Sequence, residues 1–230
     1  MLSLFVSFDP KTSISIITGE ANWLILMIFL TSFFYFFWSK PSRLTILKNS
    51  FLLNISSQFE IALKSKKDSS KMIFATLFIF ILFSNFMGLI PNIFTSTSHL
   101  TFNLFLSIPM WTGFLFYGWT KYTNKMLAHL VPNGTPLPLI SFMVLIELIS
   151  TTIRPLTLSI RLMANMVSGH LLLTLMGNSM VSSSLLITMI LVLVQTMLSS
   201  LEIGVAMIQA YVFCMLLTLY SDDSDYSKDH

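Results

Sequence analysis

Residues 140–177 read ISFMVLIELISTTIRPLTLSIRLMANMVSGHLLLTLMG, and residues 180–220 form a second apolar stretch of similar length. As a continuous helix, either stretch would measure about 55 to 60 Å, roughly twice the 30 Å hydrocarbon core of a bilayer. Such lengths demand a break or a steep tilt. Pro155 offers only a kink, because residues 157–166 resume a helical apolar pattern. We therefore expect a hairpin of two long, steeply tilted membrane helices.

Three shorter apolar runs precede this hairpin. The sequence predicts membrane spans at residues 22–38, 72–90 and 100–120, each near the length that crosses a bilayer. Residues 43–71 are amphipathic, so this segment should lie on the membrane surface. The lysines on or beyond its polar side are Lys48, Lys64, Lys66, Lys67 and Lys71. Its apolar residues at helical spacing are Leu44, Leu47, Phe51, Leu52, Ile55, Phe59 and Leu63. Residues 221–230 form a polar, acidic tail.

The expected fold class is therefore an all-α polytopic membrane protein with about five membrane helices and one surface amphipathic helix, in a single membrane domain. The composition agrees, because 54% of the 230 residues are hydrophobic and 10% are charged, whereas about 25% of residues are charged in soluble proteins. Basic residues cluster in one loop without interleaved aromatics, so nucleic acid is not an expected partner. Cys214 is the single cysteine, and we expect no metal and no cofactor.

Positive charge predicts the orientation in the membrane. After three crossings, the basic loop at residues 40–71 and the pair Lys121 and Lys125 fall on the same side, which the positive-inside rule makes cytoplasmic or matrix-facing. The N-terminus should then lie on the opposite side. His99 and His129 fall in the expected loops, where we interpret them as ordinary solvated residues.

Charged side chains inside the long apolar stretches need a reason. There are four of them, namely Glu147, Arg154, Arg161 and Glu202. Each costs about 2.5 to 3.5 kcal/mol at the centre of a lipid-exposed helix, so all must face protein or water. The first three are seven residues apart and share one helix face. The same spacing recurs on the second long helix in Gln195, Glu202 and Gln209, so the two polar stripes could line one aqueous path.

Two interpretations of these groups remain open from the residues alone. They could pair with one another and hold the helices together, as buried ionic or amide networks do in membrane bundles. Alternatively, they could handle protons, because an arginine keeps its charge in proteins whereas Glu147, Glu202 and His170 can titrate. A fixed cation among titratable groups favours the second interpretation.

The run LSIRLMANMVSGHLLL, residues 158–173, resembles the signature of the a subunit of F-type ATP synthases, with its Arg-Leu-x-x-Asn core. The resemblance extends over most of the chain, and the first 70 residues match mainly in layout. Its other matching positions are Ser84, Asn85, residues 88–91, Glu147, Pro155, Glu202, Gln209 and Tyr211.

The resemblance implies a proton-translocating stator subunit that binds no nucleotide and is not itself an enzyme. Arg161 would face the essential carboxylate of each passing subunit of the c-ring, with Asn165 one turn away. His170 and Glu202 would serve a half-channel from the intermembrane or external side, and Glu147 would serve the matrix or cytoplasmic half-channel. The remaining candidates for proton translocation are Gln209 and, as secondary candidates, Arg154 and Gln195.

The implied partners are the c-ring, the peripheral stalk, other membrane-sector subunits, protons and the lipid bilayer. The order of His170 and Glu202 resembles the mitochondrial form, which implies the mitochondrial inner membrane rather than a bacterial plasma membrane. The first twenty residues contain acids and no arginine, unlike a transit peptide, which fits synthesis inside the organelle.

Other classes of protein fit the residues less well. An independent secondary transporter would need a broken helix or an internal repeat. A scaffold without transport would leave the intramembrane charges purely structural. An intramembrane enzyme would need a nucleophile set, and the sequence contains no HExxH, no GxSxG and no glycine-rich phosphate loop.

Overall fold

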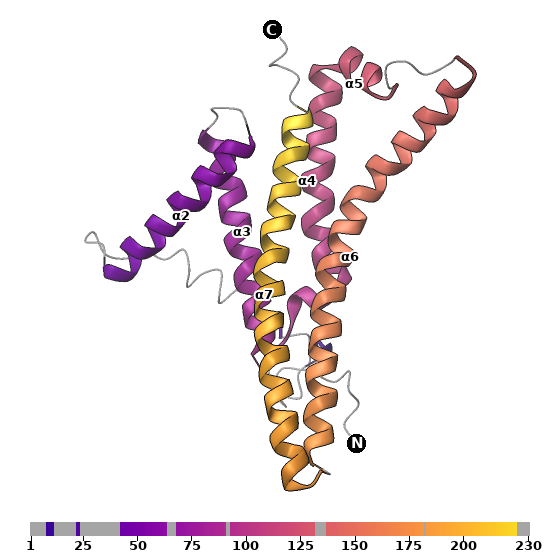
Figure 1. The fold of residues 1–230 in the computed structure, drawn as a ribbon. Helices are drawn as coiled ribbons and strands as arrows, with labels where there is room; N and C mark the ends of the chain where they lie inside the picture. Colours follow the sequence, from indigo (N-terminus) through magenta and orange to yellow (C-terminus); the bar gives the residue numbers. More distant parts are fainter. Residues whose placement is uncertain are drawn as a thin grey trace.

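The computed structural model describes residues 8–11, 22–23, 42–63, 68–90, 93–131, 137–181 and 183–224. Over these ranges the chain is helical and turn structure without strands (Figure 1). Its elements are α2 (Arg43–Ala62), α3 (Asp68–Leu89), η2 (Ser96–Ser98), α4 (Leu100–Lys121), α5 (Thr123–His129), η3 (Leu137–Leu139), α6 (Ile140–Val181) and α7 (Leu185–Ser224). Among the described residues, α3, α4, α6 and α7 are long and apolar enough to cross a membrane. The predicted fold class, an all-α polytopic membrane protein, is confirmed.

Several boundaries differ from the expected ones. Only the first two positions of the expected first span, residues 22–38, are among the described residues. Residues 225–230 of the tail lie outside them. Helix α2 ends at Ala62 and α3 begins at Asp68, so the single segment expected at residues 43–71 is divided. Lys71 is only 7% exposed, because its Nζ lies 2.7 Å from a carboxylate oxygen of Glu60. This lysine therefore joins α3 to α2 and is not part of a solvated polar face.

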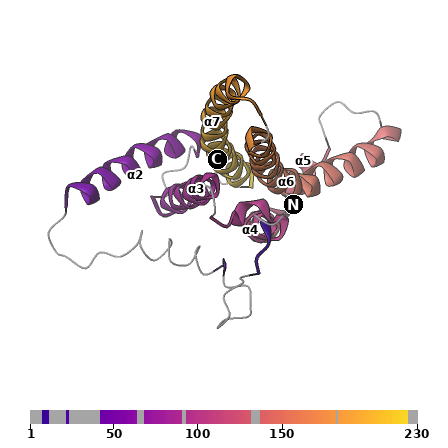
Figure 2. The same ribbon diagram turned by 90° about the horizontal axis from the view of Figure 1, so that it is seen from below.

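The apolar stripe of α2 is only half covered. Ile55 and Phe59 are buried in the core of the bundle, whereas Leu47 is 65% exposed and Phe51 is 51% exposed. Figure 2 shows why: α2 contacts the bundle near its C-terminal end and projects away from it toward its N-terminal end. The N-terminal half of this helix keeps its apolar side chains uncovered, which suits contact with lipid.

Helices α3 and α7 form the tightest part of the bundle. Ala75 on α3 and Ala210 on α7 are fully buried, as are Phe213 and Cys214 one turn further along α7. Small side chains at a helix interface let two backbones approach closely, which matters in a membrane because lipid offers no hydrophobic drive for helix association. The core is centred on α3 and the C-terminal half of α7, and side chains of α2 and α6 complete it.

Helices α6 and α7 form the long hairpin. Both run without a break over their described residues, and Pro155 lies inside α6. Figure 1 shows the two helices antiparallel and side by side near their connecting turn, while α6 changes direction along its length and its N-terminal part diverges from α7. The turn and the α3–α4 connection lie toward one end of the molecule. The C-terminal ends of α4 and α7 lie toward the other end.

The α3–α4 connection is packed into the bundle. Asn103, 2% exposed, donates from Nδ2 to the carbonyl oxygens of Thr97 at 2.8 Å and of Ser159 at 3.4 Å. His99 lies with its ring centroid 5.4 Å from that of Trp23, and its Nε2 is buried without a hydrogen-bond partner. The interpretation of His99 as a solvated loop residue was therefore wrong, because this connection folds back under the helices. The side chain of His129 is not among the parts of the chain that the structure describes.

Candidate functional site

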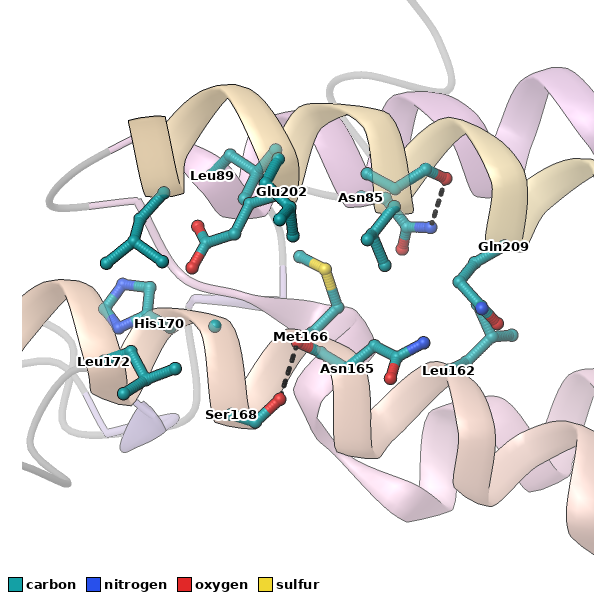
Figure 3. Close-up of a pocket in the computed structure, with 15 residues that line it drawn as sticks. Asn85, Leu89, Leu162, Asn165, Met166, Ser168, His170, Leu172, Glu202 and Gln209 are labelled. Atoms are coloured by element: carbon teal, nitrogen blue, oxygen red, sulfur yellow. Dashed lines mark hydrogen bonds between the residues drawn. The ribbon is translucent and has the colours of Figure 1, made fainter. Parts of the chain in front are cut away.

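A cavity of about 230 Å³ lies between α3, α6 and α7 (Figure 3). Four of the residues predicted to translocate protons line it together, with Asn165 and His170 on α6 and Glu202 and Gln209 on α7. The other polar residues of the lining are Asn85 on α3 and Ser168 on α6. Of the two predicted polar stripes, only Glu202 and Gln209 of the second line the cavity. The stripe of the first long helix, with Glu147, Arg154 and Arg161, does not, so the two stripes do not line this space together.

At one end of the cavity, Glu202 meets His170. Figure 3 shows the carboxylate of Glu202 pointing across the cavity toward the imidazole ring of His170. Oε2 of Glu202 and Nδ1 of His170 are both buried without a hydrogen-bond partner. Buried polar atoms are nearly always partnered by protein or water, because leaving one unpaired costs free energy. This pair of unpaired, titratable groups is a natural place for water and a proton.

Helices α6 and α7 approach each other closely beside this pair. A Cβ atom placed on Gly169 would lie 2.6 Å from Oε1 of Glu202 and 2.9 Å from its Cδ. No other residue type fits at this position without moving the carboxylate. Gly169 was not among the predicted residues, and its sequence context offers no signal, because glycines in membrane helices are common.

At the other end of the cavity, Asn165 and Gln209 bring two amides near each other (Figure 3). Glu202 and Gln209 are two turns apart on α7, which is about 10 Å along the helix axis. Each amide offers both donors and an acceptor. This end can therefore pass hydrogen bonds to water but cannot itself titrate.

Asn85 stands between the two ends and was missed as a site residue, although the resemblance included it. It is 1% exposed, and its Nδ2 donates to the carbonyl oxygen of Ala206 at 3.4 Å, while its Oδ1 has no partner. A sequence signal existed, since an amide inside an apolar span is expensive unless it meets protein or water. Asn85 carries no charge and lies in a shorter span, outside the polar stripes of the two long helices.

Glu147 and Arg154 lie away from the cavity. Arg154 Nη2 is 3.7 Å from Oε1 of Glu147, and the guanidinium carbon is 5.4 Å from the ring centroid of Tyr220 on α7. Both charged residues lie on α6, so their ion pair is within one helix, and the contact of Arg154 with Tyr220 is the one that joins α6 to α7. Arg154 is thus in contact with groups on both long helices near the end where α7 finishes.

Loss of this contact should be tolerated. Arg154 and Glu147 are about one-third exposed, and exposed ion pairs and cation–π contacts contribute about 0.5 kcal/mol each. We expect Arg154→Gln to lower ATP-driven proton pumping by at most about fivefold, the equivalent of about 1 kcal/mol. Pumping measured per assembled complex in vesicles checks this, with Tyr220→Phe, which keeps the aromatic ring, as the matched control. A complete loss of pumping in Arg154→Gln with Tyr220→Phe intact would contradict a merely supporting role.

Arg161 and Gln195 are, besides Glu147 and Arg154, the other two predicted residues that the cavity does not include. Gln195 lies one turn before the first cavity residue of α7, Leu198. Arg161 is exposed, and within the described ranges it has no ion-pair partner. Three of its neighbours on the same face of α6 are small and exposed, namely Thr157, Ala164 and Ser168. The guanidinium is therefore presented on an open face of the hairpin.

Known proteins match almost the whole chain. The sequence model of the family described as ATP synthase A chain matches residues 21–222. The chain is 49% identical over 224 residues to ATP synthase subunit a of Locusta migratoria, covering 97% of this chain and 99% of that protein. It is 50% identical over 224 residues to the subunit of the same name from Drosophila melanogaster, with the same coverage. For Artemia franciscana, the figures are 47% over 223 residues, 97% and 100%.

Proposed function

Because the chain belongs to the ATP synthase A chain family, we propose that it is the stator that carries protons to and from a rotating c-ring through two half-channels. Members of this family are the proton-translocating subunit of the membrane sector of ATP synthase. In this proposal the chain makes and breaks no covalent bond. It couples the flow of protons to rotation, and thereby to ATP synthesis, as a subunit of an ATPase complex whose catalytic sites lie elsewhere.

The observation that carries the proposal is the exposure of Arg161. A charged side chain facing lipid at mid-helix costs about 2.5 to 3.5 kcal/mol, yet Arg161 lies exposed on a membrane-length helix. No acidic side chain of the described residues pairs with this cation, and the proposal supplies one from a neighbouring subunit. The small side chains of Thr157, Ala164 and Ser168 around it leave room for a partner helix to approach. A ring of subunits that each carry a carboxylate in the membrane meets both requirements.

The proposed role of Arg161 is electrostatic. Desolvation in lipid holds the rotor carboxylate neutral, and a guanidinium about 5 Å away at an effective dielectric near 20 favours ionisation by roughly 3 kcal/mol. Each passing site would therefore release its proton as it reaches Arg161. Because an arginine does not deprotonate, the same group also blocks a direct proton leak between the two half-channels.

Polar groups toward opposite ends of the molecule support two separate half-channels. The cavity with His170 and Glu202 includes Leu89, the last residue of α3, at the end away from Lys121 (Figure 1). Glu147 lies near the start of α6, toward the other end. Along α6, Arg161 is about 21 Å from Glu147 and about 14 Å from His170 if the helix is regular. In the proposal, the cavity opens to the intermembrane side, and Glu147 serves the matrix side.

The proposed setting is the mitochondrial inner membrane, with the c-ring, the peripheral stalk and other membrane-sector subunits as partners. The order of His170 and Glu202, together with relatives from insects and a crustacean, supports this choice over a bacterial plasma membrane. An independent transporter would bind its substrate at an interruption in a membrane helix. No observation favours that alternative, because α6 and α7 are continuous over their described residues.

Removing the charge at Glu202 tests the proposal. We expect Glu202→Gln to lower ATP-driven proton pumping in vesicles by at least about tenfold, the equivalent of 1.4 kcal/mol, because an amide of the same shape cannot carry a proton between waters. Gln195→Leu should change pumping less than twofold, since Gln195 shares the stripe but not the cavity. Assembly is quantified on native gels. Native-like pumping in Glu202→Gln would remove this carboxylate from the proton path and with it the proposed cavity half-channel.

A further inference from the structure

We propose that the side chain of Met166 is a movable apolar barrier that divides the cavity into two polar compartments, so that it must turn aside for a proton to travel from Glu202 toward Arg161. The inference rests on the proposed function of the cavity and adds a residue that neither the charges nor the polar stripes of the two helices had indicated.

The first argument is position. The polar groups of α7 in the cavity, Glu202 and Gln209, are about 10 Å apart along the helix, and between them α7 contributes Val205 and Ala206 to the lining. On α6, Met166 lies one turn before His170 on the same face. Figure 3 shows the thioether of Met166 reaching into the space between the two polar ends. The middle of the cavity is therefore apolar on both long helices.

Asn85 is the exception at this middle level, and it strengthens the inference. Its Nδ2 is held by the carbonyl of Ala206 while its Oδ1 is buried and unpaired. A single acceptor there can hold a water molecule once space opens beside it, because a buried water needs polar partners and room. A displaced Met166 side chain would provide the room.

The second argument is chemistry. Methionine is unbranched and has three rotatable side-chain bonds, so it changes rotamer more readily than a β-branched residue of similar size. Met166 is 7% exposed, so its position controls interior space and not a surface. An apolar constriction blocks water and protons when closed and admits them when it widens by a few ångströms, as hydrophobic gates in channels do.

The third argument is the space that the methyl group of Met166 occupies. A Cβ atom placed on Gly88 of α3 would lie 2.9 Å from Cε of Met166 and 3.2 Å from Cγ2 of Thr95. The Met166 methyl therefore rests in the space that the missing side chain of Gly88 leaves. Filling that space would push the thioether toward the cavity and hold the barrier closed.

Substitutions at Met166 separate a barrier from a packing residue, with pumping measured per assembled complex. Met166→Ala should pump at least as fast as the native complex, because it opens the middle of the cavity. Met166→Ile should pump roughly fivefold more slowly, the equivalent of about 1 kcal/mol, because its β-branch is stiff, while Met166→Leu stays within about twofold. A packing residue would give the reverse order, since large-to-small changes cost most and near-isosteric swaps cost least.

If Met166→Ala does not assemble, the Ile and Leu variants decide, because both conserve volume and differ mainly in stiffness. Equal pumping by these two variants would contradict the proposal that Met166 is a movable barrier. So would slower pumping in an assembled Met166→Ala complex than in Met166→Ile.

A double substitution tests whether the Met166 methyl group needs the space beside Gly88. Gly88→Ala alone should slow pumping by roughly fivefold, about 1 kcal/mol, and should have less than twofold effect in the Met166→Ala background, where no methyl remains to be displaced. Gly177→Ala is the control, because a Cβ there meets no heavy atom within 4 Å. An equal effect of Gly88→Ala in both backgrounds would assign the effect to Thr95. It would contradict the claim that the Met166 methyl group depends on the space beside Gly88.

The two hypotheses fail differently. If the cavity is not a proton path, Glu202→Gln pumps like the native complex. If only the barrier is wrong, the loss in Glu202→Gln persists and the order of the Met166 variants is that of a packing residue.

Discussion

Arg161→Ala is expected to abolish ATP-driven proton pumping, by about 150-fold or more, while the complex still assembles. The loss follows from removing the roughly 3 kcal/mol by which the guanidinium would favour ionisation of a rotor carboxylate. Assembly should survive because Arg161 is exposed and has no ion-pair partner within the described ranges, and such surface substitutions change the free energy of unfolding by about 0.5 kcal/mol or less. Pumping in vesicles and native gels of the same membranes measure the two effects separately.

Two companion variants sharpen the test of Arg161. Arg161→Lys keeps a positive charge but loses the planar fork, and a desolvated lysine can deprotonate, so we expect at least a tenfold loss of pumping, equivalent to 1.4 kcal/mol. Thr157→Ala changes an exposed residue one turn away on the same face and should pump like the native complex. Loss of assembly in Arg161→Ala, or pumping that persists, would make this arginine structural and remove the main support for the stator mechanism.

The long hairpin was predictable because its signal is length. Two apolar stretches near 40 residues long must break or tilt steeply in a bilayer, Pro155 offers only a kink, and the structure contains both stretches as the continuous helices α6 and α7. The seven-residue spacing of Glu202 and Gln209 likewise predicts a shared helix face, and both residues line the cavity. Periodicity within one helix is enough for such statements.

The limit of the cavity along α7 could not be read from periodicity. Gln195 has the same spacing as Glu202 and Gln209 but does not line the cavity. The cavity needs a wall from α3, which ends at Leu89, and Figure 1 shows the first part of α7 extending past that end. How far two helices overlap depends on the packing of the whole bundle, which no spacing encodes.

Burial of short polar segments was equally beyond the sequence pattern. His99 looks like a loop residue because it stands between two apolar runs in a stretch of serines and threonines. In the structure, Asn103 ties this connection to the carbonyl of Ser159 on α6, and the rings of Trp23 and Phe94 cover His99. The cause is tertiary contact with residues distant in sequence, so local composition gave the wrong exposure.

Gly169→Ala is expected to lower proton pumping by roughly tenfold, and a shorter acid at position 202 should restore it. The added methyl group would lie 2.6 Å from Oε1, 2.9 Å from Cδ and 3.2 Å from Cγ of Glu202, so the carboxylate must turn away from His170. An off-rotamer or displaced carboxylate costs about 1 kcal/mol or more, and a tenfold effect corresponds to 1.4 kcal/mol. Glu202→Asp draws the carboxylate back by one methylene group and makes room for the methyl.

The double variant Gly169→Ala with Glu202→Asp should therefore pump faster than either single variant, because the two size changes compensate across the α6–α7 contact. Glu202→Asp alone leaves a gap beside Gly169, and Gly169→Ala alone overfills that space. Gly177→Ala controls for the gain in helix propensity that any glycine-to-alanine change brings, since a Cβ there meets nothing within 4 Å. General damage to packing would make the two changes additive or worse. Compensation, in contrast, requires that the carboxylate at position 202 function at a fixed distance from α6.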